Sequence, residues 1–419
     1  MAKRRLLEVT GVVAAIVLVI LLLQVARTSL QGQSQPDGAG AAANPGPASK
    51  TPWGDPDLQG IWTDNFQTPL QRPPKYANRE FLTEDERAAL DRLRASAPRQ
   101  NDTGIAKRGT EQDVSGAYNS VFTSLKHTSR RTSLIVDPPD GRIPPVTPEV
   151  QKRRSEFRAF ELALLQATDV CKNKLAGCAG GKYGPPSPRR GEVSPSYIAT
   201  AGIGGGAINR SDGPEDRSLG ERCLAGFLPD FGGFRQIVQS RGAVSMFYDT
   251  GQGQGWERVI PVTASPHLPP DIRLWRGDSR GRWEGNTLVV DVTNFSPKTD
   301  YQGSRDNLHL VERWTRIDAN TLEYVVRIED STTWPKPWTV KQELTRQSTQ
   351  ANRFYMEPRC HEGNYGLTGQ LAGARAEDKA FAAGRGPDPA TVCGAGCGTG
   401  IEEVEDPDGV RDGAIGGVR

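Results

Sequence analysis

The residues best suited to acid–base chemistry are few in this chain. Four histidines occur in 419 residues: His127, His267, His309 and His361. Histidine titrates near neutral pH, so this scarcity narrows the choice of a general base. In RCHEGNYGL, Glu362 directly follows His361. This pair can activate water or abstract a proton; alternatively, His361 fills space in a disulfide-tied loop.

A second candidate is the charged cluster in GDSRGRWEGNTLVVDVTNF, residues 277–295. We interpret DSRG and EGN as turns between apolar strands, which places the charges in solvent at strand ends. Strand ends also form the mouth of a barrel, so Asp278 or Arg282 can share a rim with His361. His309 alternates with Leu308 and Leu310, which places it on the opposite face of its strand, in solvent or against a ligand.

Tryptophans near strand ends are candidates for ligand contact. Eight occur in the chain. At a barrel mouth they can stack on flat or sugar ligands, although packing is their more ordinary role. The predicted ligand-binding residues are Trp275, Arg282, Trp283, His309, Trp314 and Tyr324.

The N-terminus predicts export. Lys3, Arg4 and Arg5 precede an apolar run. A cleaved signal peptide and an uncleaved anchor both fit; we favour an anchor over residues 1–27, because residues 6–26 reach spanning length if Glu8 lies near the headgroups. The body is then periplasmic and held at the inner membrane, or secreted if the segment is cleaved.

Export makes disulfides the favoured interpretation of the six cysteines. Two pairs are close in sequence and could close short loops, and the remaining two could form a long-range bridge: Cys171 with Cys178, Cys393 with Cys397, and Cys223 with Cys360. A zinc site is the alternative, but only residues 393–397 have ligand-like spacing and no histidine follows them. We therefore predict no metal.

Composition argues against several other functions. The net charge is +2, which does not indicate nucleic acid as a partner. Gly202, Gly204 and Ala207 mimic part of a dinucleotide fingerprint, but a loop follows them instead of a helix. No GxxxxGK[ST] or HExxH motif occurs. We predict no cofactor.

The predicted organisation is a flexible linker at 28–50, one β-rich domain at 51–375 and a disordered tail at 376–419. The N-terminal part of the domain, 51–222, contains two helices. FLTEDERAALDRLRASA begins with a capping box from Thr83 to Glu86, and the second helix has Thr147 as cap and Pro148 at its first position.

Residues 223–366 change to strand patterns. Eight apolar segments follow one another with short turns: FRQIVQS, AVSMFYDT, WERVIPV, IRLW, NTLVVDVTNF, LHLVERWTRID, TLEYVVRIED and WTVKQELTR. Several alternate apolar and polar residues, which is typical of a sheet with one face on a core. The predicted fold is mainly β, an antiparallel meander that forms a barrel, of which a calycin-like barrel is one form, or a sandwich.

Several long phrases resemble an uncharacterised family of exported bacterial proteins: PWGDPDLQGIW, RTSLIVDPPDGRIP, GDSRGRWEGNTLVV and CHEGNYGL. The resemblance spans about residues 51–375. It implies export and a single body, and it supplies no reaction because the family has no assigned chemistry. Residues 173–209 resemble an insertion relative to that family, stapled at its start by Cys171 and Cys178.

Three functional hypotheses follow. The first is a binding module for a hydrophobic or aromatic small molecule inside a β-lined cavity, which rests on fold analogy. The second is a hydrolase or lyase that uses His361 and Glu362. The third is a structural subunit of an envelope complex, whose partner would be another envelope protein. The sequence does not decide whether the chain is an enzyme.

Overall fold

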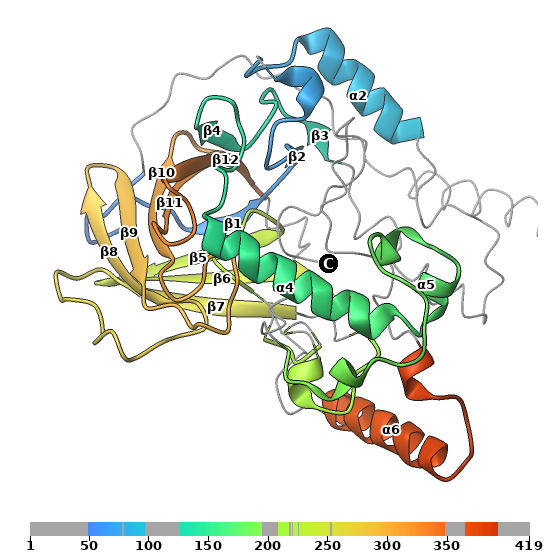
Figure 1. Cartoon of the computed structure of the whole chain (residues 1–419). Helices are drawn as coiled ribbons and strands as arrows, with labels where there is room; N and C mark the ends of the chain where they lie inside the picture. Colours follow the sequence, from blue (N-terminus) through green and yellow to red (C-terminus); the bar gives the residue numbers. More distant parts are fainter. Residues whose placement is uncertain are drawn as a thin grey trace, which may run out of the picture. The chain divides into compact units, whose positions relative to one another are not determined.

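Nine antiparallel strands dominate the structure, a computed structural model that describes residues 49–77, 79–96, 126–194, 208–217, 219, 221–224, 226–251, 254–347 and 365–392. The strands are short and joined mainly by hairpins (Figure 1). Their bounds are β1 Gly60–Thr63, β5 Phe234–Ser240, β6 Ala243–Gly251, β7 Gln254–Pro261, β8 Asp278–Glu284, β9 Thr287–Thr293, β10 His309–Arg316, β11 Thr321–Glu329 and β12 Trp338–Arg346.

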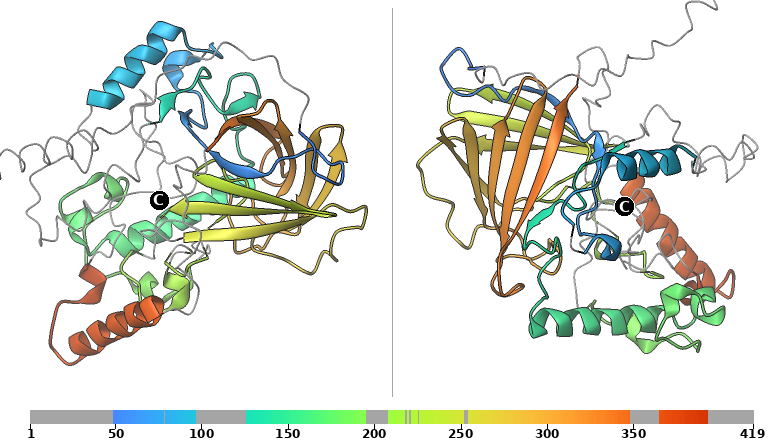
Figure 2. Two further views of the ribbon diagram at one scale, coloured as in Figure 1. Left: turned by 180° about the vertical axis from the view of Figure 1, so that it is seen from behind. Right: turned by 90° about the horizontal axis from the view of Figure 1, so that it is seen from above.

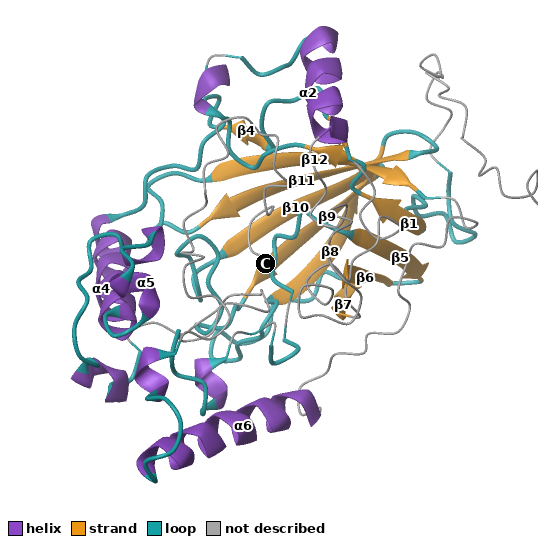
Figure 3. Cartoon of the chain, turned by 90° about the vertical axis from the view of Figure 1, so that its right-hand side faces the viewer, coloured by secondary structure: helices purple, strands orange, loops and turns teal. Residues whose placement is uncertain are grey.

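These strands form a nearly closed barrel. Their order is β7-β6-β5-β1-β12-β11-β10-β9-β8, so β1 lies between β12 and β5 and joins the ends of the meander. The outermost strands meet where Val262 bridges Gly281 and the Thr263 amide donates to the Gly281 carbonyl over 3.0 Å. Figure 3 shows the strands fanned in this order. The prediction of a mainly β, antiparallel meander is confirmed, in its barrel form.

Three further short strands lie beside the barrel. β4 (Ile135–Asp137) pairs with β12, and β2 (Phe66–Gln67) pairs in parallel with β3 (His127–Thr128). The right-hand view of Figure 2 shows the curvature of the main sheet.

Side chains alternate across the barrel wall as the sequence predicts. On β9 the side chains of Leu288, Val290 and Val292 are fully buried in the core. On β11 the same holds for Leu322, Tyr324, Val326 and Ile328. Burying one apolar face of each strand is the main stabilising contribution.

The prediction for residues 272–284 placed the strand at the wrong position along the chain. The segment IRLW, predicted as a strand, lies in a loop with a single bridge from Leu274 to Phe295. DSRG, predicted as a turn, begins strand β8. The reason is period-2 alternation: Ser279 and Gly281 are buried while Arg282 and Glu284 are exposed, so a polar sequence still presents one face to the core.

Two helices precede the meander, as predicted. α2 spans Glu84–Ser96, and its capping box is present: the Thr83 amide donates to Glu86 Oε2 over 2.9 Å and the Glu86 amide donates to Thr83 Oγ1 over 3.2 Å. α4 spans Pro148–Leu165. Its cap residue, Thr147, instead donates its hydroxyl to the Thr332 carbonyl, which ties the helix start to the loop before β12.

The remaining helical elements are short, apart from α6. They are η1 Pro74–Tyr76, α5 Asp169–Lys172, η2 Ala176–Cys178, η3 Pro188–Gly191, η4 Pro214–Asp216, α6 Tyr365–Ala382 and η5 Pro389–Thr391. α6 runs past residue 376, where we predicted a disordered tail, so that boundary was placed too early. Its Arg375 Nε donates to the Asp212 carbonyl over 2.9 Å.

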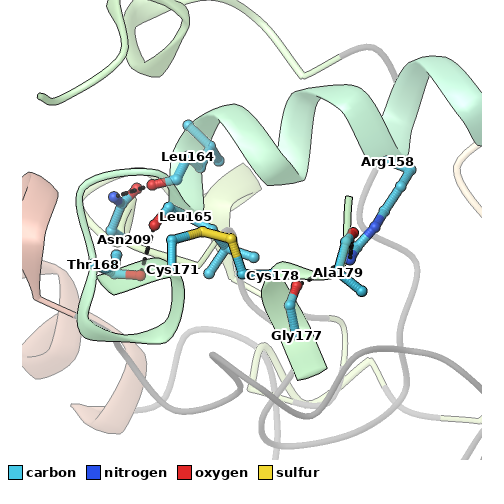
Figure 4. Close-up of a disulfide and its surroundings, with 9 residues drawn as sticks. All are labelled: Arg158, Leu164, Leu165, Thr168, Cys171, Gly177, Cys178, Ala179 and Asn209. Atoms are coloured by element: carbon cyan, nitrogen blue, oxygen red, sulfur yellow. Dashed lines mark hydrogen bonds between the residues drawn. A yellow bond between two sulfur atoms is a disulfide. The ribbon is translucent and has the colours of Figure 1, made fainter. Parts of the chain in front are cut away.

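A disulfide joins Cys171 to Cys178, as predicted (Figure 4). It forms a small apolar cluster with Leu165 and Val170, separate from the barrel core. Cys223 is also disulfide-bonded, and its partner lies outside the described residues. The pairings of Cys223 with Cys360 and of Cys393 with Cys397 stay predictions.

The predicted anchor, residues 6–26, lies outside the ranges given above. Within those ranges, no helix combines the length and the apolar character needed to cross a bilayer.

Asp330 fastens the loops at one end of the barrel. Its carboxylate accepts hydroxyl hydrogen bonds from Ser304 (2.6 Å), Thr332 (2.6 Å) and Thr333 (2.7 Å). Burial raises the pKa of Asp330, but these hydrogen bonds outweigh it and lower the pKa below its ordinary value.

Residues 226–233 lie just before β5, pack against the barrel core and are called the plug here. Leu228 and Phe231 in the plug belong to the barrel core. The Phe231 carbonyl accepts from Gln342 Nε2 over 2.6 Å, and its ring lies 6.1 Å from that of Tyr324. At Gly226 (φ +113°) a side chain would collide with the ring of Trp256. The plug therefore packs on the inward-facing side chains of three strands.

Candidate ligand site inside the barrel

Two stacked aromatic pairs line the inner wall of the barrel. Trp314 on β10 and Tyr324 on β11 are cross-strand partners with ring centroids 4.0 Å apart. Tyr248 on β6 and Trp256 on β7 are also partners, with centroids 4.0 Å apart and ring planes 1° from parallel. Side chains directly opposite on neighbouring antiparallel strands lie close enough for such stacking. All four are buried in the barrel core.

A buried ion pair lies on the same wall. Arg258 Nη2 on β7 donates to Glu312 Oε2 on β10 over 2.6 Å, and the two side chains are 4% and 0% exposed. Arg258 Nε donates to Ser279 Oγ over 2.9 Å. The Tyr324 hydroxyl donates to Glu312 Oε1 over 2.7 Å. The network thus links four strands through one carboxylate and one guanidinium.

Burial and charge set the protonation states in this network. Burial lowers the pKa of Arg258, but the nearby Glu312 carboxylate more than compensates and raises it above its ordinary value. Burial raises the pKa of Tyr248 to about 12. Burial and the Glu312 charge raise that of Tyr324 well above its usual range. Both phenols are therefore neutral donors at physiological pH.

Arg235 is the second guanidinium buried on this wall. It lies on β5, is fully buried, and is 5.3 Å from the Tyr248 ring centroid and 6.0 Å from that of Trp314. Its Nη2 donates to the backbone carbonyl of Asp230 and lies 3.3 Å from Asp230 Oδ1. The guanidinium is thus in cation–π contact with one ring of each aromatic pair.

Several N–H groups on this wall have no acceptor. Among the described residues, the atoms without a hydrogen-bond partner include Nε and Nη1 of Arg235, Nη1 of Arg258, and the indole Nε1 of Trp256 and Trp314. One acceptor, Oε1 of Gln342, also has no hydrogen-bond partner among the described residues. Buried polar atoms nearly always find a partner, so this surplus of donors is a chemical signal.

Sequence reasoning identified Trp314 and Tyr324 and missed the polar members of this wall. A signal was present: in WERVIPV, Arg258 is in phase with Trp256 and Ile260, and in HLVERWTR, Glu312 is in phase with Leu310 and Trp314. A charge in phase with the apolar positions of a strand predicts an inward-facing charge.

The outer wall carries a different network. His267 Nδ1 lies 2.9 Å from Asp278 Oδ2 and its Nε2 lies 2.8 Å from Asp291 Oδ1. The other oxygen of Asp291 lies 3.1 Å from His309 Nε2. Arg280 Nη1 donates to Asp278 Oδ1 over 2.6 Å. These contacts tie the loop between β7 and β8 to the strands, and they occupy Asp278 fully.

The remaining predicted residues are not brought together. Arg282 pairs with Glu284, which also accepts from Arg313 Nη1 over 2.9 Å, on the exposed outer face. Trp275 lies in the loop before β8, while Trp283 packs against the barrel core. Ligand contact by Arg282, His309, Trp275 and Trp283 stays a prediction.

The catalytic pair His361 and Glu362 lies outside the described residues, so the hydrolase or lyase hypothesis also stays a prediction. Within the part of the chain that the structure describes, no group of three or more histidine, cysteine or acidic side chains is arranged to hold a metal ion.

Comparison with known proteins adds little to the site. No family model and no curated protein sequence matches this chain. Among solved structures, a mutant of the fluorescent protein UnaG is similar, at 14% identity over 27% of this chain and 71% of that chain, with a TM-score of 0.18. The fold class follows from strand order and register: the chain contains a nearly closed antiparallel barrel.

Proposed function

We propose that this protein is an exported, membrane-tethered barrel that binds a hydrophobic or aromatic small molecule against the inner wall of the barrel. The supporting architecture is an antiparallel barrel with an apolar inner face, a fold that can hold one small ligand. The two stacked aromatic pairs supply flat surfaces for such a molecule.

One observation carries the proposal: the inner wall has more N–H donors than the described polypeptide satisfies. Leaving a buried donor unmet costs about 1–3 kcal/mol. Several such donors beside aromatic faces match a ligand site with an apolar lining and a few polar groups. A flat molecule with acceptor atoms would satisfy both features.

A fluorescence titration of the full-length chain tests binding. The probe is N-phenyl-1-naphthylamine, an uncharged aromatic amine whose emission rises in an apolar environment. The test variant is Val326→Trp, which adds a large side chain on the inward face of β11. The control is Val325→Trp, which adds the same side chain one position away, on the other face.

We expect saturable binding to the wild-type chain and to the Val325→Trp variant, and its loss in Val326→Trp. Circular dichroism verifies that each variant is folded, since an added inward side chain can cost about 1–3 kcal/mol. An absence of saturable binding to the folded wild-type chain would reject the proposal. Equal binding by both variants would place the site outside the barrel.

Export and tethering are separate parts of the proposal. They are supported by Lys3, Arg4 and Arg5 before the apolar run, and by the Cys171–Cys178 disulfide, which suits an oxidising compartment. In a bacterial host we expect the chain in the membrane fraction after alkaline extraction, with its body sensitive to protease added to spheroplasts. A body protected from that protease would contradict export.

A further inference from the structure

We infer that the barrel ligand is an organic acid whose anionic group binds the guanidinium of Arg235. This inference rests on the proposed function and specifies the chemistry of the ligand.

Arg235 is placed as an anchor for a polar group on a flat molecule. Its side chain has no exposed surface, and it lies between the rings of Tyr248 and Trp314. A ligand group that reaches Arg235 would therefore bring the rest of the molecule beside aromatic faces. β5 and β10 are each hydrogen-bonded to a neighbouring strand on both sides, which fixes the positions of Arg235 and Trp314.

The two guanidinium groups buried on this wall are compensated unequally. Arg258 has a carboxylate oxygen of Glu312 at 2.6 Å. Arg235 has Oδ1 of Asp230 at 3.3 Å, and that oxygen also accepts from the Gly232 amide over 2.8 Å. Burial raises the pKa of Asp230, which weakens it further as a counter-charge. A buried charge needs a close, well-hydrogen-bonded partner, and for Arg235 the protein supplies a weak one.

The unsatisfied atoms also favour an anion over other ligands. Arg235 Nε and Nη1 are donors without partners among the described residues, and Trp314 Nε1 is a third. A carboxylate accepts at two oxygens and carries a negative charge that can approach Arg235 more closely than Asp230 does, whereas a neutral carbonyl supplies acceptors without the charge. A cationic ligand would be repelled by the guanidinium.

The experiment measures displacement of N-phenyl-1-naphthylamine by two competitors of the same shape. 2-Naphthoate is an anion at pH 7, and 2-naphthamide is uncharged. Each competes for wild type, Arg235→Met, Arg235→Lys and the control Arg313→Met, which removes an exposed arginine of the outer face. Binding of the fluorescent probe itself reports the proposed function, independently of the charge preference.

We expect 2-naphthoate to displace the probe from wild type at a concentration at least about tenfold lower than 2-naphthamide. Arg235→Met should abolish this preference, Arg235→Lys should retain part of it, and Arg313→Met should leave it unchanged.

Equal displacement by the two competitors in wild type overturns the inference while the proposed function stands. So does a preference that survives in Arg235→Met. If the probe does not bind at all, both fail. Should Arg235→Met not fold, the wild-type ratio together with Arg235→Lys decides the question.

Discussion

Removal of the Glu312 carboxylate tests whether the barrel interior is as dry as the structure indicates. In Glu312→Leu, the Arg258 guanidinium stays 4% exposed and keeps the neutral hydroxyls of Ser279 and Tyr248 as hydrogen-bond partners. Breaking a buried pair on one side costs about 3–5 kcal/mol, because an uncompensated charge is left behind. In a domain of roughly 300 residues that loss lowers the melting temperature by roughly 5–8 °C.

The double variant separates the charge effect from packing. Arg258→Met combined with Glu312→Leu removes both charges and keeps similar volume, so its remaining cost is chiefly the unmet hydroxyl of Tyr324, about 1–3 kcal/mol. The two single changes are therefore not additive, and we expect a coupling free energy of at least about 3 kcal/mol.

Urea denaturation followed by tryptophan fluorescence and by circular dichroism measures these free energies, provided that the two transitions coincide. The outer-face pair of Glu284 and Arg313 is the control. Both of its side chains are more than 40% exposed, so its coupling should be far smaller. A coupling below about 0.5 kcal/mol for Arg258 and Glu312 would refute the reasoning, because it would mean that water screens the pair.

Three further predictions concern parts of the structure outside the inner wall of the barrel. Cys178→Ser opens an eight-residue loop and should destabilise the surrounding segment by about 2.5 kcal/mol. We expect faster proteolysis within residues 173–194 and an unchanged unfolding transition of the barrel; a shifted barrel transition would contradict the separate clustering of this disulfide. Asp330→Asn should lower the urea midpoint at pH 7 and have little effect at pH 3. The pKa of Asp330 is lowered in the folded state, so its stabilisation is present above the unfolded pKa of about 3.9 and is lost as the pH falls through the folded pKa. An equal loss of stability at both pH values would contradict this sign. Gly277→Ala should lower the urea midpoint of the protein more than Gly285→Ala does. Both glycines have positive φ (+69° and +60°), but only the Cβ added at Gly277 would meet a backbone oxygen, at 2.7 Å. Equal effects would show that the loop relaxes.

Much of the fold could be predicted from local patterns. Seven of the eight predicted meander segments overlap strands of the structure, because period-2 alternation records which face is buried. The capping box at Thr83 was equally local. The exception is IRLW, which lies in a loop; the strand there is β8, which was missed because polar residues on its outer face resembled a turn. β1 was missed because four residues far upstream are recruited by pairing with β5 and β12, a contact that no local pattern encodes.

The site was harder to predict, because its residues lie on separate strands that only the closed barrel brings together. Trp314 and Tyr324 were found from their residue types. Arg235 was overlooked because a single arginine near the start of a strand is ordinarily exposed. Its burial depends on the plug, whose Asp230 accepts its hydrogen bond. The alternation along β5 indicates which face of the strand Arg235 is on, but it does not show that Asp230 of the plug packs against it.

Native mass spectrometry of the full-length chain, purified from its own host under non-denaturing conditions, tests the central claim most directly. Bound ligand should appear as a discrete added mass on wild type, and negative-ion analysis of the released molecule should identify an organic acid. The same preparation of Arg235→Met should lack that mass, while Arg313→Met should retain it. A folded wild-type chain that carries no added mass, or an uncharged ligand equally bound to Arg235→Met, would contradict the account.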